Sequence, residues 1–483
     1  MKPIPLQCAV QAIQVLFQDK LESKKRIRKE MLLMLGYILE GTRGRALGLI
    51  KLILQSEPNY NANPFIPILT TDRSFASTLY ELFVSNADTE IGSIVNLLCQ
   101  YRKLEGSNCF MEKMAGEDDF RVFKKLTDGC SYSMVQIYGI VNVERKRRSS
   151  LFAQLNLIQT QKKDVIDRCI TPFLSPIVSF YNLILYNAKY LAYLTSTTLE
   201  KDDDVTPPET IIFPSLVSLT CILLEHFDGS SDLLKLCLSL LQCMYELPMI
   251  SRYLNHHRPA KAIANESFVP DYQITCYLLD LFQRLLHSPE KMSTESVTSI
   301  VVIISRILRS LKRKGDPGLN YRNWSKLIER NLALLVTEPA RLHSSLITDS
   351  VCFNCIYIVI HAEAIIGDRV SFVDLLHTLF SHGNIIRNMD QKRGQEEVNQ
   401  MRTFQTLFDI NLYNLRLIID FFQGRIEKGL SKKGVKRSTL NVKEIIDQNY
   451  CHLELEVNSS LSLDAFSSYR EGEDELRPFL RIE

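Results

Sequence analysis

The sequence lacks the short signatures that most enzymes carry. No glycine-rich phosphate loop precedes a helical stretch, no Gly-x-Ser-x-Gly sequence occurs, and no His-Glu-x-x-His pair is present. The only metal-like spacing is Cys352 and Cys355 with His361. Because a closed zinc site needs four ligands, this set is too small. We therefore expect a protein that is not an enzyme and that holds no cofactor and no metal.

Strand patterns and a strong net charge are also missing. Alternation of apolar and polar residues is rare, and no Asn-Gly turn joins two such runs. The net charge at pH 7 is only +2 over 483 residues, so the chain as a whole has no attraction for nucleic acid. Residues 1–5 do not open a signal peptide, and the twelve cysteines lie in apolar stretches. Reduced, mostly buried thiols in a cytosolic protein are the expectation.

Apolar residues at helical spacing fill most of the chain. The run from Ile300 to Leu311 is the clearest case, because Ile and Leu recur there every three or four residues. Turn-forming pairs such as Asp128-Gly129 and Ser288-Pro289 are expected to separate helices of about 12 to 20 residues. The pattern predicts an all-α fold, an armadillo/HEAT-like α-solenoid.

A change in composition predicts the domain organisation. Residues 197–209 read TTLEKDDDVTPPE, where acidic residues and two prolines replace the apolar pattern. We expect N-terminal helical repeats over 1–196, a linker over 197–209, C-terminal helical repeats over 210–458, and a partly ordered tail over 459–483.

Two apolar stretches are long enough to raise the question of a membrane span. Residues 172–194 contain Asn182, Asn187 and Lys189, and residues 351–366 are short for a span of about 20 residues. Buried solenoid helices are the preferred interpretation of both stretches.

The densest charge run lies at residues 144–150, which read ERKRRSS, and an apolar segment with Phe152 follows it. A solvated helix face, an anionic membrane surface, a nuclear-localisation sequence and a basophilic kinase site all fit this run. For the membrane alternative, the predicted contacts are Arg145, Lys146, Arg147, Arg148 and Phe152.

A compact charged corner at residues 101–108, YRKLEGSN, resembles a turn in the armadillo-like helical domain-containing protein 3 family. In that family a buried helix ends in Asn-Tyr-Arg-Lys-Tyr-Glu-Ser-x-Asn-Pro-Tyr before an acidic stretch. Here residues 117–119 supply that acidic stretch.

Three later segments are similar to the same family and occur in the same order. Residues 320–327, NYRNWSKL, stand where the family has a Trp-containing helix start. Residues 414–422, NLRLIIDFF, match an Asn-x-Arg-x-Ile-Ile-x-His-Phe pattern except at Asp420. Residues 449–455 and 469–479 follow the family's final run of Tyr, Leu and Phe. The resemblance extends from about Lys25 onward.

The resemblance implies a scaffold at the cytoplasmic side of the Golgi, peripheral to the membrane. It implies recruitment of phosphatidylinositol 4-kinase beta and of an Arf exchange factor, and a role in Golgi organisation and protein secretion. A second hypothesis is a nuclear or other cytosolic helical-repeat scaffold that binds proteins.

Two corners are the candidate partner-binding sites. In the family an aromatic-Leu-His corner is associated with holding the kinase, and Tyr253, Leu254 and Asn255 stand at that position here. We expect these residues to form an exposed turn. The charged corner contributes Tyr101, Arg102, Lys103 and Glu105.

Trp324 follows a Pro-Gly break, and Leu327 and Ile328 continue an apolar face after it. We expect Trp324 to lie partly buried near the start of a helix.

Overall fold

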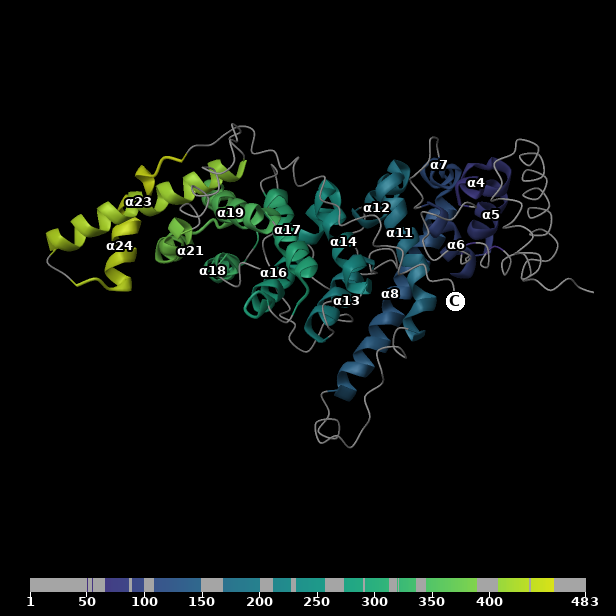
Figure 1. Ribbon diagram of the computed structural model, residues 1–483, viewed down its shortest axis with the longest axis horizontal. Helices are drawn as coiled ribbons and strands as arrows, with labels where there is room; N and C mark the ends of the chain where they lie inside the picture. Colours follow the sequence, from purple (N-terminus) through teal and green to yellow (C-terminus); the bar gives the residue numbers. More distant parts are fainter. Residues whose placement is uncertain are drawn as a thin grey trace, which may run out of the picture. The chain divides into compact units, whose positions relative to one another are not determined.

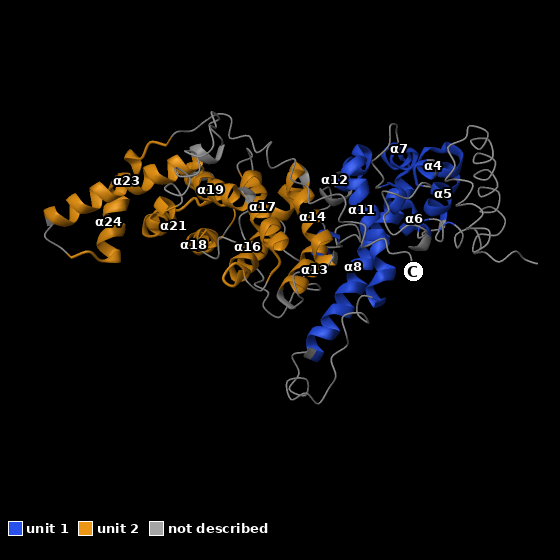
Figure 2. Cartoon of the chain, in the orientation of Figure 1, with its two compact units in different colours: residues 1–215, 472–483 blue, residues 216–471 orange. Residues whose placement is uncertain are grey.

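The structure is a computed structural model, and Figure 1 shows it with its helices labelled. The described residues fall into two compact units, unit 1 up to Ser215 and unit 2 from Leu216 on (Figure 2). The structure describes residues 50, 54, 66–86, 89–99, 108–148, 168–199, 212–226, 232–256, 273–289, 292–311, 319, 321–335, 345–388, 407–433 and 436–455. Within these residues there is no strand, which confirms the all-α prediction.

The described part of unit 1 consists of short helices and one long helix. Its elements are α4 (Ile66–Thr71), α5 (Arg73–Asn86), α6 (Thr89–Cys99), α7 (Cys109–Gly116), α8 (Phe120–Arg148), η2 (Thr171–Phe173), α11 (Leu174–Tyr186) and α12 (Ala188–Leu199). Helix α13 (Ile212–His226) begins at the end of unit 1 and continues into unit 2.

The starts of α7 and α8 follow from the sequence. The Asn108 side chain accepts hydrogen bonds from two backbone amides of α7 and so caps that helix. Ahead of α8, Asp119 Oδ1 accepts a bond from the Arg121 amide at 2.8 Å. Carboxylates at this end of a helix are favoured by the helix dipole.

The break expected at Asp128-Gly129 is wrong, because α8 continues through both residues. A mid-helix glycine costs only about 1 kcal/mol. On either side of it, Leu126 and Cys130 are buried, and burying one such side chain outweighs that cost. Tertiary packing therefore overrides the local turn signal.

Helix α11 is the centre of unit 1, where it packs against α6, α7 and α8. Its contact with α6 includes buried amides as well as apolar side chains. Asn96 Nδ2 donates to Ser179 Oγ at 2.8 Å, and Asn182 Nδ2 donates to Asn96 Oδ1 at 3.1 Å. Because an unpaired buried amide is costly, these bonds fix how α6 and α11 lie against each other.

The apolar stretch 172–194 is two helices rather than one. The chain breaks at Asn187, whose backbone is extended and whose Nδ2 donates to the carbonyl oxygens of Met114 and Glu117. By length and composition the helix Arg168–Tyr186 could cross a membrane, but 61% of the tested stretch is buried. A bent pair, Leu233–Glu246 with Ile250–His256, passes the same test only if taken together. Core helices of soluble proteins also pass it.

Unit 2 contains the remaining helices. They are α14 (Asp232–Glu246), α15 (Pro248–His256), α16 (Ile274–Leu285), α17 (Thr294–Leu311), α18 (Trp324–Leu334), α19 (Ser345–Ile360), α20 (Ala362–Ile365), α21 (Arg369–Ser381), α23 (Leu407–Lys433), α24 (Thr439–Asn449) and η6 (Tyr450–His452). The second apolar stretch, 351–366, is split at His361 between α19 and α20.

These helices form two rows, which define a solenoid. In the first row α14 packs on α17, α17 on α19, and α19 on α23. In the second row α16 packs on α18, α18 on α21, and α21 on α24 (Figure 1). Contacts between rows, such as α18 with α19 and α23 with α24, close the core. Each helix thus touches its neighbours along the stack, as in armadillo-like repeats.

Of the predicted linker 197–209, residues 197–199 belong to the end of α12. The rest of that segment, and the tail after residue 455, lie outside the described residues.

Trp324 is the first residue of α18 and is fully buried. Its expected place at a helix start is confirmed, and its burial is more complete than expected. The Tyr321 ring meets the indole edge-on at 4.8 Å between centroids. Next to it, Asn323 Nδ2 donates to Asp280 Oδ1 at 3.1 Å and ties this corner to α16. Asn323 therefore links the start of α18 to α16, next to the buried indole.

We predict that Trp324→Ala lowers the free energy of unfolding by about 3 to 5 kcal/mol, because the fully buried indole leaves a cavity. Urea unfolding followed by far-UV circular dichroism measures the loss. Lys326→Ala, an exposed change in the same helix, is the control and should leave the midpoint unchanged. A midpoint for Trp324→Ala equal to that of the control would contradict this packing.

Candidate binding surface

The long helix α8 has one face that packs into unit 1. On this face the side chains of Phe123, Met134, Ile137 and Val141 are buried. They lie against neighbouring helices, above all α11. The Phe123 ring also meets the Tyr190 ring of α12 edge to face, with 5.2 Å between ring centroids. Packing of this face holds α8 in unit 1 and so determines which α8 residues lie on the opposite, exposed face.

The opposite face of α8 exposes an apolar stripe, which we call the α8 stripe. It consists of Tyr132, Val135, Gly139 and Val143, whose spacing places them on one side of the helix. Tyr132 is 60% exposed and Val143 is 57% exposed, although large apolar side chains are normally buried. Contiguous exposed apolar residues of this kind mark surfaces that bind another macromolecule.

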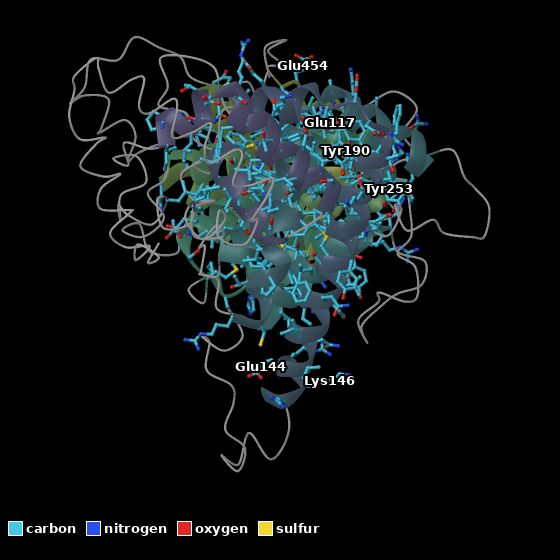
Figure 3. All side chains as sticks on the ribbon, turned by 90° about the vertical axis from the view of Figure 1, so that its right-hand side faces the viewer. Glu117, Glu144, Lys146, Tyr190, Tyr253 and Glu454 are labelled. Carbon is cyan, nitrogen blue, oxygen red and sulfur yellow. The ribbon has the colours of Figure 1, made fainter. Side chains whose placement is uncertain are left out.

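The predicted basic run continues the α8 stripe at the end of the helix. Lys146 and Arg147 are exposed, Arg145 is half-buried, and Glu144 is buried. Figure 3 shows Glu144 and Lys146 together at the lower end of α8. The Arg148 side chain and Phe152 lie outside the described residues. An apolar stripe that ends in cations suits an amphipathic partner helix or an anionic membrane surface.

The expectation that Tyr253, Leu254 and Asn255 form an exposed turn is wrong. They belong to the last turn of α15 and are all buried. Asn255 Nδ2 donates to Ser310 Oγ at 3.0 Å, and Asn255 Oδ1 accepts from Thr275 Oγ1 at 2.8 Å. The three residues therefore stabilise the contacts of α15 with α16 and α17.

Burial also changes the chemistry of Tyr253, which Figure 3 labels. It raises the pKa of the phenol to about 12, because the charged phenolate is disfavoured away from water. The sequence favours a turn here, because α15 is short and residues 257–261, HRPAK, contain three polar residues and a proline. The burial of Tyr253, Leu254 and Asn255 becomes visible only when the neighbouring helices are in place.

The charged corner lies mostly outside the described residues. This holds for all four of its predicted partner-binding residues, Tyr101, Arg102, Lys103 and Glu105. Asn108, the last residue of the corner, is the cap of α7. Its Nδ2 also donates to the Leu98 carbonyl oxygen at 2.7 Å, which ties the start of α7 to the end of α6.

Cys352 and Cys355 are both buried in α19. Burial raises the pKa of the Cys355 thiol far above its ordinary value, so the thiol is protonated at neutral pH. The pKa of Cys237 is raised to about 12 by the same cause. In the described part of the chain, no three His, Cys, Asp or Glu side chains gather to hold a metal ion.

The two rows of helices in unit 2 define the class of protein, an armadillo-like helical solenoid. Residues 272–482 match the family model of the C-terminal part of armadillo-like helical domain-containing protein 3. Over these residues the chain is similar to that family, in agreement with the sequence resemblance. Neither the curated proteins nor the solved structures gave a match.

The matched segment covers most of the solenoid of unit 2, from α16 to α24. It includes Trp324 and the residues 414–422, both of which carried the resemblance. Armadillo-like helical domains commonly mediate interactions between proteins. The family therefore agrees with a helical scaffold.

We predict that Asn255→Ala lowers the free energy of unfolding by about 1 to 3 kcal/mol, because Thr275 and Ser310 lose a buried partner. Thermal unfolding of the purified chain measures this loss. Arg252→Ala in the same helix is the control, since that side chain is exposed and its removal should cost little. If Asn255→Ala were as stable as the control, α15 would not be held by this network.

Proposed function

We propose that the chain is a non-enzymatic scaffold at the cytoplasmic face of the Golgi. In this role it supports recruitment of phosphatidylinositol 4-kinase beta and of an Arf exchange factor, and thereby Golgi organisation and protein secretion. Support comes from the family match over residues 272–482 and from the ordered sequence resemblance. The solenoid also gives a rigid surface, on which binding costs little ordering entropy.

The observation that carries the proposal is the exposed α8 stripe. Tyr132, Val135 and Val143 form an apolar face on a helix that is firmly held on its other side. A protein partner that covers this face would gain free energy by removing it from water, at roughly 25 cal/mol per Å². Aromatic side chains such as Tyr132 are frequent anchors in such interfaces.

The cations at the end of α8 have a second proposed role in the same scaffold. Lys146 and Arg147 would contact anionic lipid, together with Arg145, Arg148 and Phe152. This arrangement would place the α8 stripe close to the membrane, where the kinase and the exchange factor act.

The alternative proposal is a nuclear or other cytosolic scaffold. The observation that favours it is the same basic run, Arg145 to Arg148, which has the composition of a nuclear-localisation sequence. The two proposals differ in where the full chain accumulates in cells. Tagged protein that overlaps a Golgi marker supports the first, and nuclear staining that Lys146→Glu with Arg147→Glu abolishes supports the second.

We predict that the triple variant Tyr132→Ala, Val135→Ser, Val143→Ser reduces capture of phosphatidylinositol 4-kinase beta and the Arf exchange factor at least tenfold. Loss of central contacts in an interface commonly costs more than 1 kcal/mol each. Co-precipitation from cells and binding of purified proteins measure the effect.

Val370→Ser is the matched control, because Val370 is an exposed apolar residue of unit 2 that lies away from α8 in the sequence. It should leave capture unchanged. Thermal stability of the triple variant should stay close to that of the parent, since exposed side chains contribute little to folding. Undiminished capture of both partners by the folded triple variant would contradict a partner site on α8.

A further inference from the structure

The segment that joins α23 to α24 has an unusual charge. Residues 428–443 read KGLSKKGVKRSTLNVK, which contains six basic residues and no Asp or Glu. The chain as a whole is nearly neutral, so this segment is a local concentration of positive charge. The family match covers the segment but assigns no role to it.

The fold brings the two ends of this segment together. Gly429 near the end of α23 lies against Ile445 of α24, and a Cβ added at Gly429 would stand 2.8 Å from Ile445 Cδ1. A side chain at position 429 would require the Ile445 side chain to shift. The end of α23 and the start of α24 consequently lie together at the left end of the ribbon in Figure 1. We call this region the α23–α24 tip and define it as Lys428, Lys432, Lys436, Arg437 and Leu440.

The cations of the α23–α24 tip are exposed and not neutralised. Lys428, Lys432 and Lys436 form no ion pair with any residue that the structure describes. Lys443 differs, because its ammonium pairs with Asp374 at 2.6 Å, and we therefore leave it out of the tip. Arg437 lies 5.6 Å from the centre of the Phe380 ring. Among the described residues of unit 2, no carboxylate pairs with the three lysines of the tip.

A large apolar side chain stands among these cations. Leu440, the second residue of α24, is 80% exposed. The turn that presents it is held by hydrogen bonds: Asn441 Nδ2 donates to the Lys436 carbonyl oxygen at 2.9 Å, and the Asn441 amide donates to Ser438 Oγ at 3.3 Å. Leu440 is therefore presented to solvent by a fixed turn.

We propose that the α23–α24 tip docks on the surface of an anionic phospholipid membrane. Lysines close to such a surface gain electrostatic attraction that does not depend on a fixed geometry, and an exposed leucine can enter the interfacial layer. An acidic protein segment is the other possible occupant. Such partners are bound best by the planar fork of arginine, but this tip has a single arginine, and it lies by Phe380.

This inference does not depend on the proposed Golgi function, and it uses residues of unit 2 rather than of α8. The experiment is flotation of the purified full chain with vesicles. Vesicles of phosphatidylcholine alone are compared with vesicles that also contain phosphatidylserine, at low and at physiological salt. Only the phosphatidylserine vesicles should bind, and salt should weaken the binding because it screens surface charges.

Charge reversal tests the cations. Each cation near an anionic surface changes the partition coefficient roughly fivefold, so reversing all four should reduce it about a hundredfold or more. The tip variant is Lys428→Glu, Lys432→Glu, Lys436→Glu and Arg437→Glu. The matched control reverses four exposed cations elsewhere in unit 2, namely Arg284→Glu, Arg309→Glu, Arg322→Glu and Lys326→Glu. Both variants have the same net charge, so only the tip variant should lose this binding.

Leu440→Ser should reduce the partition coefficient severalfold and leave its salt dependence unchanged, because it removes apolar contact and no charge. The far-UV circular dichroism of all variants should match that of the parent, since the altered side chains are exposed.

Three outcomes would overturn the proposal. The tip and control variants could bind vesicles equally well. Binding could instead be lost only in Lys146→Glu with Arg147→Glu, which would place membrane contact on α8. Finally, the parent chain could bind poly-glutamate and ignore phosphatidylserine vesicles, in which case the tip would bind an acidic protein. If a tip variant loses vesicle binding but still localises to the Golgi in cells, the proposed function stands. The vesicle experiment and the localisation experiment therefore test the two proposals separately.

Discussion

Residues 305–310 of α17 bind three neighbouring helices of unit 2. Ser305 donates to Asn354 of α19 at 2.7 Å, Arg306 pairs with Glu246 of α14 at 2.9 Å, and Ser310 accepts from Asn255 of α15. The helix is buried on nearly every side, so each of these polar groups needs a partner inside the protein. This segment therefore fixes how α17 lies against three neighbouring helices at once.

The placement of the possible binding surfaces follows from this constraint. The inner helices are covered by neighbouring helices. Their polar side chains form hydrogen bonds inside the protein, as Asn255 does. In unit 2 this leaves helix ends and outer faces for partners, and the α23–α24 tip is such a place. In unit 1 the same logic applies to α8, which is packed along one face and exposes Tyr132 and Val143 on the other.

The sequence predicts those parts of the fold in which local pattern and packing agree. The helix start at Trp324 and the helical run from Ile300 to Leu311, which lies in α17, are of this kind. It fails at Gly129, where buried neighbours keep a helix intact through a turn-forming pair. The α8 stripe was also missed, because apolar residues at helical spacing look the same whether a neighbouring helix covers them or not. Residue spacing identifies a helix face, and only the neighbours show whether it is buried.

Hydrogen exchange of the purified chain, read by mass spectrometry, tests most directly whether α17 is the element on which unit 2 depends. Amides of a helix that opens only with its whole unit exchange most slowly. The account predicts that α17 is the most protected segment of unit 2, that α14 and α19 follow it, and that α24 exchanges fastest of these four. Exchange of α17 at the rate of α24 would contradict it.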